Sequence, residues 1–109
     1  SATSITWYEA SGTTHATYNP NGYSACAQYS EASDQSDKGT WRLPTVRELR
    51  LIYDMKAELA VVIPNLSYLS VTEYSIMTNI VYYVSFTNGY CGVTGMSMKT
   101  YRVRCVRDL

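Results

Sequence analysis

The segment that most restricts the fold is an alternating run that ends in an Asn-Gly pair. Over residues 80–87 one set of side chains alternates with another: Ile80, Tyr82, Val84 and Phe86 against Val81, Tyr83, Ser85 and Thr87. A period of two predicts a β-strand. Asn88-Gly89 follows at once, and this dipeptide favours the tight turn of a β-hairpin. The chain is therefore expected to turn back here, along a glycine-rich return that contains Gly92 and Gly95.

The clearest helix signal lies just before this strand region. Thr45 and Glu48 have the spacing of a capping box, in which each side chain bonds the backbone N–H of the other residue. An apolar stripe follows, and the helix must end before Pro64. We predict a helix over residues 46–60. A shorter stripe of Tyr23, Cys26, Ala27 and Ser30 predicts an earlier helix.

Other segments complete an α+β pattern. Residues 5–8, which are β-branched and aromatic, predict a first strand. Residues 33–40 are a polar loop, strand character returns from Ser67, and residues 101–106 predict a last strand. Strand, two helices and then several strands indicate an α+β fold. At 109 residues the chain fits a single domain spanning residues 1–109.

Charge is sparse and unevenly distributed. Nine basic residues balance nine acidic ones, so nucleic acid is a poor guess for a partner. Between Glu58 and Lys99 the only charged residue is Glu73. About forty residues are too many to bury wholly in so small a domain. Part of this neutral stretch is therefore expected to face outward, as weakly charged binding surfaces do.

Several function classes find no support in the sequence. There is no Gly-rich phosphate loop, no G-x-S-x-G elbow and no histidine beside a plausible nucleophile. A metal site is not expected, because His15 is the only histidine and no C-x-x-C pair occurs. No apolar run is long enough to cross a bilayer. We predict no enzyme, cofactor, metal or direct membrane insertion, and expect a mature form or a fragment of a longer protein.

The chain has three cysteines, Cys26, Cys91 and Cys105, whose bonding allows two interpretations. In a secreted domain an odd count implies one bridge and one free thiol. The alternative is three reduced, buried cysteines.

Tyrosine is concentrated toward the C-terminus, and tyrosine with Ser, Gly and Asn is typical of antibody-like binding surfaces. Periodicity places Tyr82 with Val84 in the core, and we assign Tyr68 to the core as well. Tyr83 lies on the opposite face. We favour ligand contact for Tyr83 and Tyr90, against the alternative that aromatic residues simply suit strands.

Four ordered motifs resemble one branch of the C-type-lectin-like fold. They are Trp41-Arg42-Leu43-Pro44-Thr45 with Glu48-Leu49, then residues 68–73 (Tyr-Leu-Ser-Val-Thr-Glu), residues 84–89 (Val-Ser-Phe-Thr-Asn-Gly) and residues 103–107 (Val-Arg-Cys-Val-Arg). The branch is shared with formylglycine-generating enzyme. It includes C-terminal domains of Bacteroides fimbrillin-type surface proteins and the variable proteins of diversity-generating retroelements. The resemblance covers residues from about Tyr23 to the C-terminus.

The resemblance implies a frame and a binding face. Two helices would flank a small antiparallel sheet with the first and last strands paired, and a disulfide would join Cys26 to Cys105, leaving Cys91 free. In retroelement-diversified members, asparagine codons become codons for Tyr, Ser, Thr, Ile, Val, Gly or Cys. Residues 74–98 nearly keep to that set. Met77, Met96 and Met98 depart from that set. Leu69 departs from the family pattern, since the family usually has Trp at this position.

We therefore predict a ligand-binding module that varies between residues 74 and 101. The expected contact residues are Tyr74, Ile76, Asn79, Val81, Tyr83, Ser85, Asn88, Tyr90, Val93 and Tyr101. The partner would be a protein or glycan on another cell or surface, met by a monomeric domain at the tip of a Bacteroides-type cell-surface or pilus protein.

Three other functions stay open. They are a structural pilus subunit, a phage tail-tip receptor binder on a virion, and a fixed calcium-independent adhesin for glycans. The glycan reading includes glycosaminoglycans, bound by the basic run of Lys99, Arg102, Arg104 and Arg107. For that run we prefer the interpretation of a solvated strand face.

Overall fold

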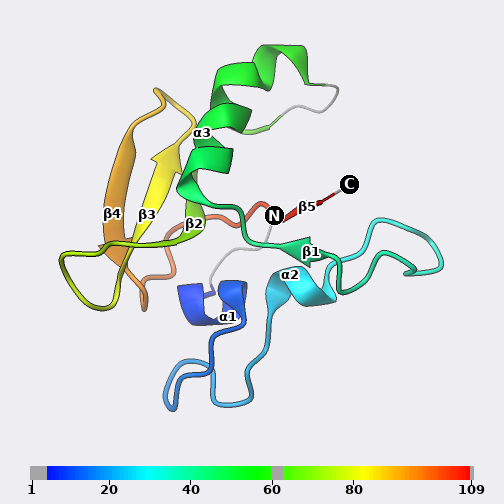
Figure 1. Cartoon of the computed structure of the whole chain (residues 1–109), viewed down its shortest axis with the longest axis vertical. Helices are drawn as coiled ribbons and strands as arrows, with labels where there is room; N and C mark the ends of the chain where they lie inside the picture. The colour runs from blue at the N-terminus through cyan, green and yellow to red at the C-terminus, as the bar shows by residue number, and fades with distance from the viewer. Residues whose placement is uncertain (1–4, 60–62, 109) are drawn as a thin grey trace.

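The computed structural model describes residues 5–59 and 63–108. Short helices and two small antiparallel sheets make up the chain, which confirms the α+β prediction. In chain order the elements are α1 (Trp7–Ser11), α2 (Ala25–Gln28), β1 (Trp41–Arg42), α3 (Val46–Met55), the 3₁₀ turn η1 (Lys56–Glu58), β2 (Ser67–Glu73), β3 (Ile80–Ser85), β4 (Cys91–Gly95) and β5 (Val106–Arg107). Figure 1 shows α3 beside the three-stranded sheet, with α2 next to β1.

The larger sheet has the order β2-β3-β4 and contains the predicted hairpin. β3 pairs antiparallel with β4 in unbroken register from Ile80 opposite Gly95 to Val84 opposite Cys91. The turn between them holds Gly89 at φ 78°, and the Gly89 amide donates to the Ser85 carbonyl over 2.7 Å. β2 pairs with the other edge of β3 through an irregular register. The hairpin predicted from Asn88-Gly89 is therefore confirmed.

The smaller sheet joins the first strand to the last. Trp41 of β1 lies opposite Arg107 of β5, so the predicted pairing of first and last strands is confirmed. The predicted extent of the last strand, residues 101–106, is wrong. Only Val106 and Arg107 form β5, while Arg102 makes an isolated parallel bridge to Tyr68 of β2. The segment 101–107 thus bonds first to β2 of the larger sheet and then to β1 of the smaller one, so it does not form one continuous strand.

The prediction of a strand over residues 5–8 is wrong, because α1 begins at Trp7. Thr6 accepts the Glu9 amide while the Glu9 carboxylate accepts the Thr6 amide, a second capping box. Gly12, at φ 84°, ends the helix in the left-handed region. These local bonds outweigh the strand preference of β-branched and aromatic residues at the same positions.

The other two helices are confirmed but shorter than predicted. Ser24 caps α2, which spans four residues and buries Cys26. The Thr45–Glu48 capping box opens α3 as predicted. α3 ends at Met55, and the chain tightens into η1 before Leu59, as helix ends often do. The predicted end at Ala60 lies outside the described residues. None of the described helices is long and apolar enough to cross a membrane.

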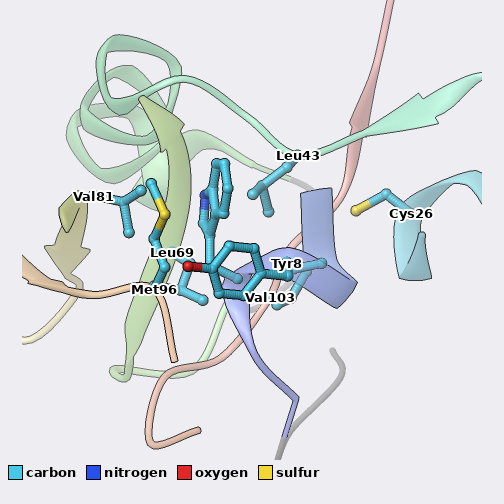
Figure 2. Close-up of a cluster of buried hydrophobic side chains, with 9 residues drawn as sticks. Tyr8, Cys26, Leu43, Leu69, Val81, Met96 and Val103 are labelled. Atoms are coloured by element: carbon cyan, nitrogen blue, oxygen red, sulfur yellow. The ribbon is translucent and has the colours of Figure 1, made fainter. Parts of the chain in front are cut away.

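The three-stranded sheet carries a hydrophobic cluster on each face. On one face α1 packs over Leu69, Val81 and Val103, and Trp7 donates its ring N–H to the buried Ser70 carbonyl over 2.9 Å. Figure 2 shows this cluster, with Tyr8 among Leu69, Met96 and Val103. On the other face α3 contributes Leu49 to a cluster that also holds Tyr68, Val84 and Phe86. A helix therefore covers part of each face of the sheet, and both faces of β3 contribute residues to the core.

A disulfide ties the two ends of the fold together. Cys26 of α2 and Cys105, which precedes β5, are bonded with their Cα atoms 5.5 Å apart. The bridge spans a sequence separation of 79 residues. Cys91 is the free cysteine and is half-buried. Both outcomes confirm what the resemblance implied.

Candidate functional site

Two tyrosines of the β3–β4 hairpin and one from the segment before β5 meet on the α1 side of the sheet. The Tyr83 ring of β3 lies 4.6 Å from the ring of Tyr101 and 6.4 Å from that of Tyr90, between centroids. Tyr90 ends the β3–β4 turn and is 60% exposed, whereas Tyr83 and Tyr101 are half-buried. We call Tyr83, Tyr90 and Tyr101 the tyrosine cluster. It brings together three of the predicted contact residues.

A glycine makes this arrangement possible. Gly92 of β4 lies opposite Tyr83, and a Cβ at this position would be 2.5 Å from the Tyr83 ring. The Tyr83 ring can therefore lie across β4 only because Gly92 has no side chain. Sequence reasoning missed this role, although a glycine inside a strand is itself a signal of close approach.

The tyrosine cluster packs against the hydrophobic core. Tyr83 and Tyr101 both pack against the cluster of α1 and the sheet, whose buried members include Leu69 and Val103. The segment that carries Tyr101 is fixed to β2, because the Leu69 amide donates to the Arg102 carbonyl and the Arg102 amide to the Ser67 carbonyl, each over 2.9 Å. The rings therefore stand on a braced surface instead of a free loop.

The chemistry of the cluster is neutral and amphipathic. Desolvation raises the pKa of the Tyr83 phenol, and the neighbouring Tyr101 and Tyr90 raise it further. A tyrosine phenol is already protonated at neutral pH at its ordinary pKa, so the Tyr83 hydroxyl stays neutral there. Such a surface offers aromatic faces for packing together with hydroxyl groups that donate or accept hydrogen bonds.

The other predicted contact residues are not part of this ring cluster, although Ser85 and Asn88 both bond the Tyr90 backbone. Ile76 is 78% exposed and lies with Asn79 in the turn between β2 and β3. Asn88 is exposed in the β3–β4 turn, at the opposite end of β3, and accepts the Tyr90 amide. Ser85 is half-buried, and its hydroxyl accepts the Thr87 amide within that turn.

Two more predicted residues lie on the α3 side of the sheet. Tyr74 packs edge-on against Tyr82, with centroids 5.6 Å apart. Val93, which is exposed, is the cross-strand partner of Tyr82 and so shares its face. Tyr74 and Val93 are therefore separated from the tyrosine cluster by the sheet itself.

The sequence assignment needs two corrections. Val81, predicted to contact ligand, is fully buried beneath α1, because that face of β3 is covered by the N-terminal helix. Tyr82, predicted to lie in the core, is only half-buried, because α3 does not extend over the whole α3 side of the sheet. Tyr68 is buried as predicted.

No group of three or more His, Cys, Asp or Glu side chains that could hold a metal ion occurs in residues 5–59 and 63–108. The basic run does not form one strand face either. Arg107 lies on β5 with its guanidinium over the Trp41 ring, 3.9 Å from Asp37, while Arg102 and Arg104 are half-buried.

The chain is a small cross-linked α+β domain. Helices flank a small antiparallel sheet, the first and last strands are paired, and one long-range disulfide joins distant segments. The chain belongs to the Lcl C-terminal domain family, whose model matches residues 1–107. This family is linked to C-type-lectin-like domains, and membership suggests a ligand-binding or adhesin-like module. A search of curated proteins finds no match.

Proposed function

We propose that the chain is a ligand-binding module whose contact surface centres on the tyrosine cluster. The observation that carries the proposal is the meeting of Tyr83, Tyr90 and Tyr101 on a braced, neutral part of the sheet. Tyrosine supplies a large contact area with few rotatable bonds to immobilise, so an exposed cluster costs little entropy on binding. Residues 74–98 contain no lysine or glutamate, which are costly to desolvate at an interface.

The partner in this proposal is a protein or glycan on another cell or surface. The domain would bind it as a monomer, by shape and aromatic contact, with neither cofactor nor catalytic step. Its place would be the surface of a bacterial cell, at the tip of a surface or pilus protein of the Bacteroides fimbrillin kind. The Cys26–Cys105 bridge supports this location, because structural disulfides persist in oxidising compartments.

Diversification by a retroelement is a further part of the proposal. The residue set of the segment 74–98 supports it, as does the exposure of Ile76, Asn79, Asn88 and Tyr90. Sequencing the region around the gene tests it. A template repeat of the segment and a reverse-transcriptase gene are expected nearby, and the absence of both would remove this part while leaving ligand binding untouched.

Replacing Tyr90 with serine tests the binding surface. Tyr90→Ser removes the most exposed ring of the cluster without opening a core cavity, because the side chain is 60% exposed. We expect binding to weaken about tenfold or more, as is typical when a central aromatic contact is removed. The measurement is binding of the labelled domain to a glycan array and to an array of extracellular proteins.

The matched control is Tyr23→Ser, because Tyr23 is also an exposed tyrosine, at 50%, but lies far along the chain on the N-terminal side of α2. Tyr23→Ser is expected to bind every array position as the unsubstituted domain does. Equal binding by Tyr90→Ser and Tyr23→Ser, or an equal loss in both, would contradict the assignment.

A further inference from the structure

A cleft lies on the α3 side of the sheet, across the sheet from the tyrosine cluster. Its volume is about 410 Å³, within the range of small-molecule sites. Seven residues line it, five from α3 and two from the strands: Val46, Arg47, Arg50, Leu51, Asp54, Tyr82 and Cys91. None of the α3 residues belongs to the contact surface proposed above, so the cleft is a separate feature of the molecule.

The surface of the cleft is mainly apolar. Val46 and Leu51 line it from the helix, and Leu51 is 58% exposed although leucine favours burial. Tyr82 and Cys91 line it from the sheet, since the pairs Tyr82–Val93 and Val84–Cys91 turn these side chains toward α3. An apolar body of moderate size would bury this surface.

Two guanidinium groups stand beside the apolar surface. Arg47 and Arg50 lie one turn apart on α3, and among the described residues Asp54 is the only carboxylate that lines the cleft. In the described residues neither arginine has a carboxylate within 4.0 Å, whereas Arg42 and Arg107 do. Arg50 instead places Nη1 3.4 Å from the Cys91 sulfur. The cleft therefore carries one excess positive charge and donors suited to a planar anion.

We propose that this cleft binds a small carboxylate that is carried on an apolar body. The carboxylate would pair with Arg47 and Arg50 at the helix, and the apolar body would lie against Leu51, Val46 and the Tyr82 ring. Charge complementarity selects an anion over an amine, and the volume of the cleft accommodates a small molecule.

Cys91 makes the cleft directly measurable, because it is the only free thiol in the chain and lines the cleft. The test is the rate at which iodoacetamide, a neutral reagent, alkylates Cys91 in the presence of octanoate or octylamine, both kept below micelle-forming concentrations. Octanoate is expected to slow alkylation saturably, at least fivefold, and octylamine to leave the rate unchanged. Equal protection by both compounds, or by neither, would overturn the proposal.

Variants of Arg50 distinguish the effect of its charge on octanoate binding from an effect on the fold. Arg50→Gln is expected to raise the half-protecting octanoate concentration about tenfold, since a charge-assisted bond is lost. Arg50→Lys keeps the charge and should retain part of the protection. Lys38→Gln removes the same charge from an exposed loop and should leave protection intact. Rates are normalised to each variant without octanoate, so that a change in Cys91 exposure alone is not counted as binding.

A second readout does not depend on the thiol. Octanoate is expected to shift the NMR methyl signals of Val46 and Leu51, and shifts confined to other parts of the molecule would overturn the proposal. The protein concentration is varied as well. If Cys91 becomes protected as the protein itself is concentrated, a second copy covers the cleft and the small-molecule assignment fails.

Discussion

Glu48 performs two structural tasks at once. Its Oε1 accepts a hydrogen bond from the Thr45 amide over 2.8 Å in the capping box of α3. Arg42 donates from Nη1 to Oε1 and from Nη2 to Oε2, each over 2.7 Å. The bond from Arg42 is the main reason that the pKa of Glu48 falls from 4.5 to about 2. Arg42 also pairs with Asp108, so one guanidinium links β1, α3 and the end of the chain.

These contacts predict a pH dependence of stability. Because the folded-state pKa of Glu48 is lowered, its contribution is complete above pH 4.5 and is lost as the pH falls from 4.5 toward about 2. Asp37, whose pKa is lowered mainly by the Ser30 hydroxyl, acts in the same direction at still lower pH. The measurement is the free energy of unfolding in urea at several pH values between 2 and 7.

Glu48→Gln is the matched variant, because it keeps the shape but not the charge. It should be less stable at neutral pH, and its stability should fall less between pH 4.5 and 2. Arg42 and Glu48 side chains are both more than a third exposed, so added salt should reduce the difference. Parallel pH profiles for the two proteins would contradict the role of Glu48.

At the scale of elements, the two capping boxes have equivalent geometry but were not equally readable. Thr6-Trp7-Tyr8-Glu9 and Thr45-Val46-Arg47-Glu48 share the T-x-x-E spacing. The second was predicted because an apolar stripe of helical period follows it. The first begins a five-residue helix, which is too short to show a period, so the β-branched and aromatic residues dominated the interpretation.

The same limit explains which parts of the binding surface could be predicted. A period of two places Tyr82 and Tyr83 on opposite faces, and the structure does so. The sequence cannot show that α1 and α3 cover both faces, and the outward placement of Val81 failed for that reason. The exposure of Tyr90 follows from local geometry, because the residue comes directly after an Asn-Gly turn, whereas its contact with a ligand stays a prediction.

Removing the capping residue of α1 or of α3 tests how much each helix cap contributes to the stability of the fold. Thr6→Ala and Thr45→Ala each delete one hydroxyl acceptor and are expected to lower the free energy of unfolding by about 0.5–2 kcal/mol. Thr6 is buried and α1 covers one core cluster, so its change should lie at the upper end of that range. Urea denaturation measures both values, and Thr13→Ala, at an exposed position, is the control. A neutral Thr6→Ala would contradict the structural role of α1.

For the whole molecule, the disulfide is the longest covalent constraint. It closes a loop with a sequence separation of 79 residues and joins α2 to the segment before β5. Replacing Cys26 and Cys105 with serine is expected to lower the free energy of unfolding by about 2–5 kcal/mol, because the unfolded chain regains conformational freedom. Chemical denaturation of this variant, with Cys91→Ser as the control, makes the measurement. A loss no larger than that of Cys91→Ser would show that the bridge does not brace the frame.

In the proposed function, the cross-linked frame presents the tyrosine cluster to a partner. NMR chemical-shift mapping with a partner found on the arrays tests it most directly. The largest shifts are expected on Tyr83, Tyr90, Tyr101 and the backbone of Gly92, while α2 stays unchanged. Shifts centred on α1 and α2, with the tyrosine cluster unaffected, would contradict it.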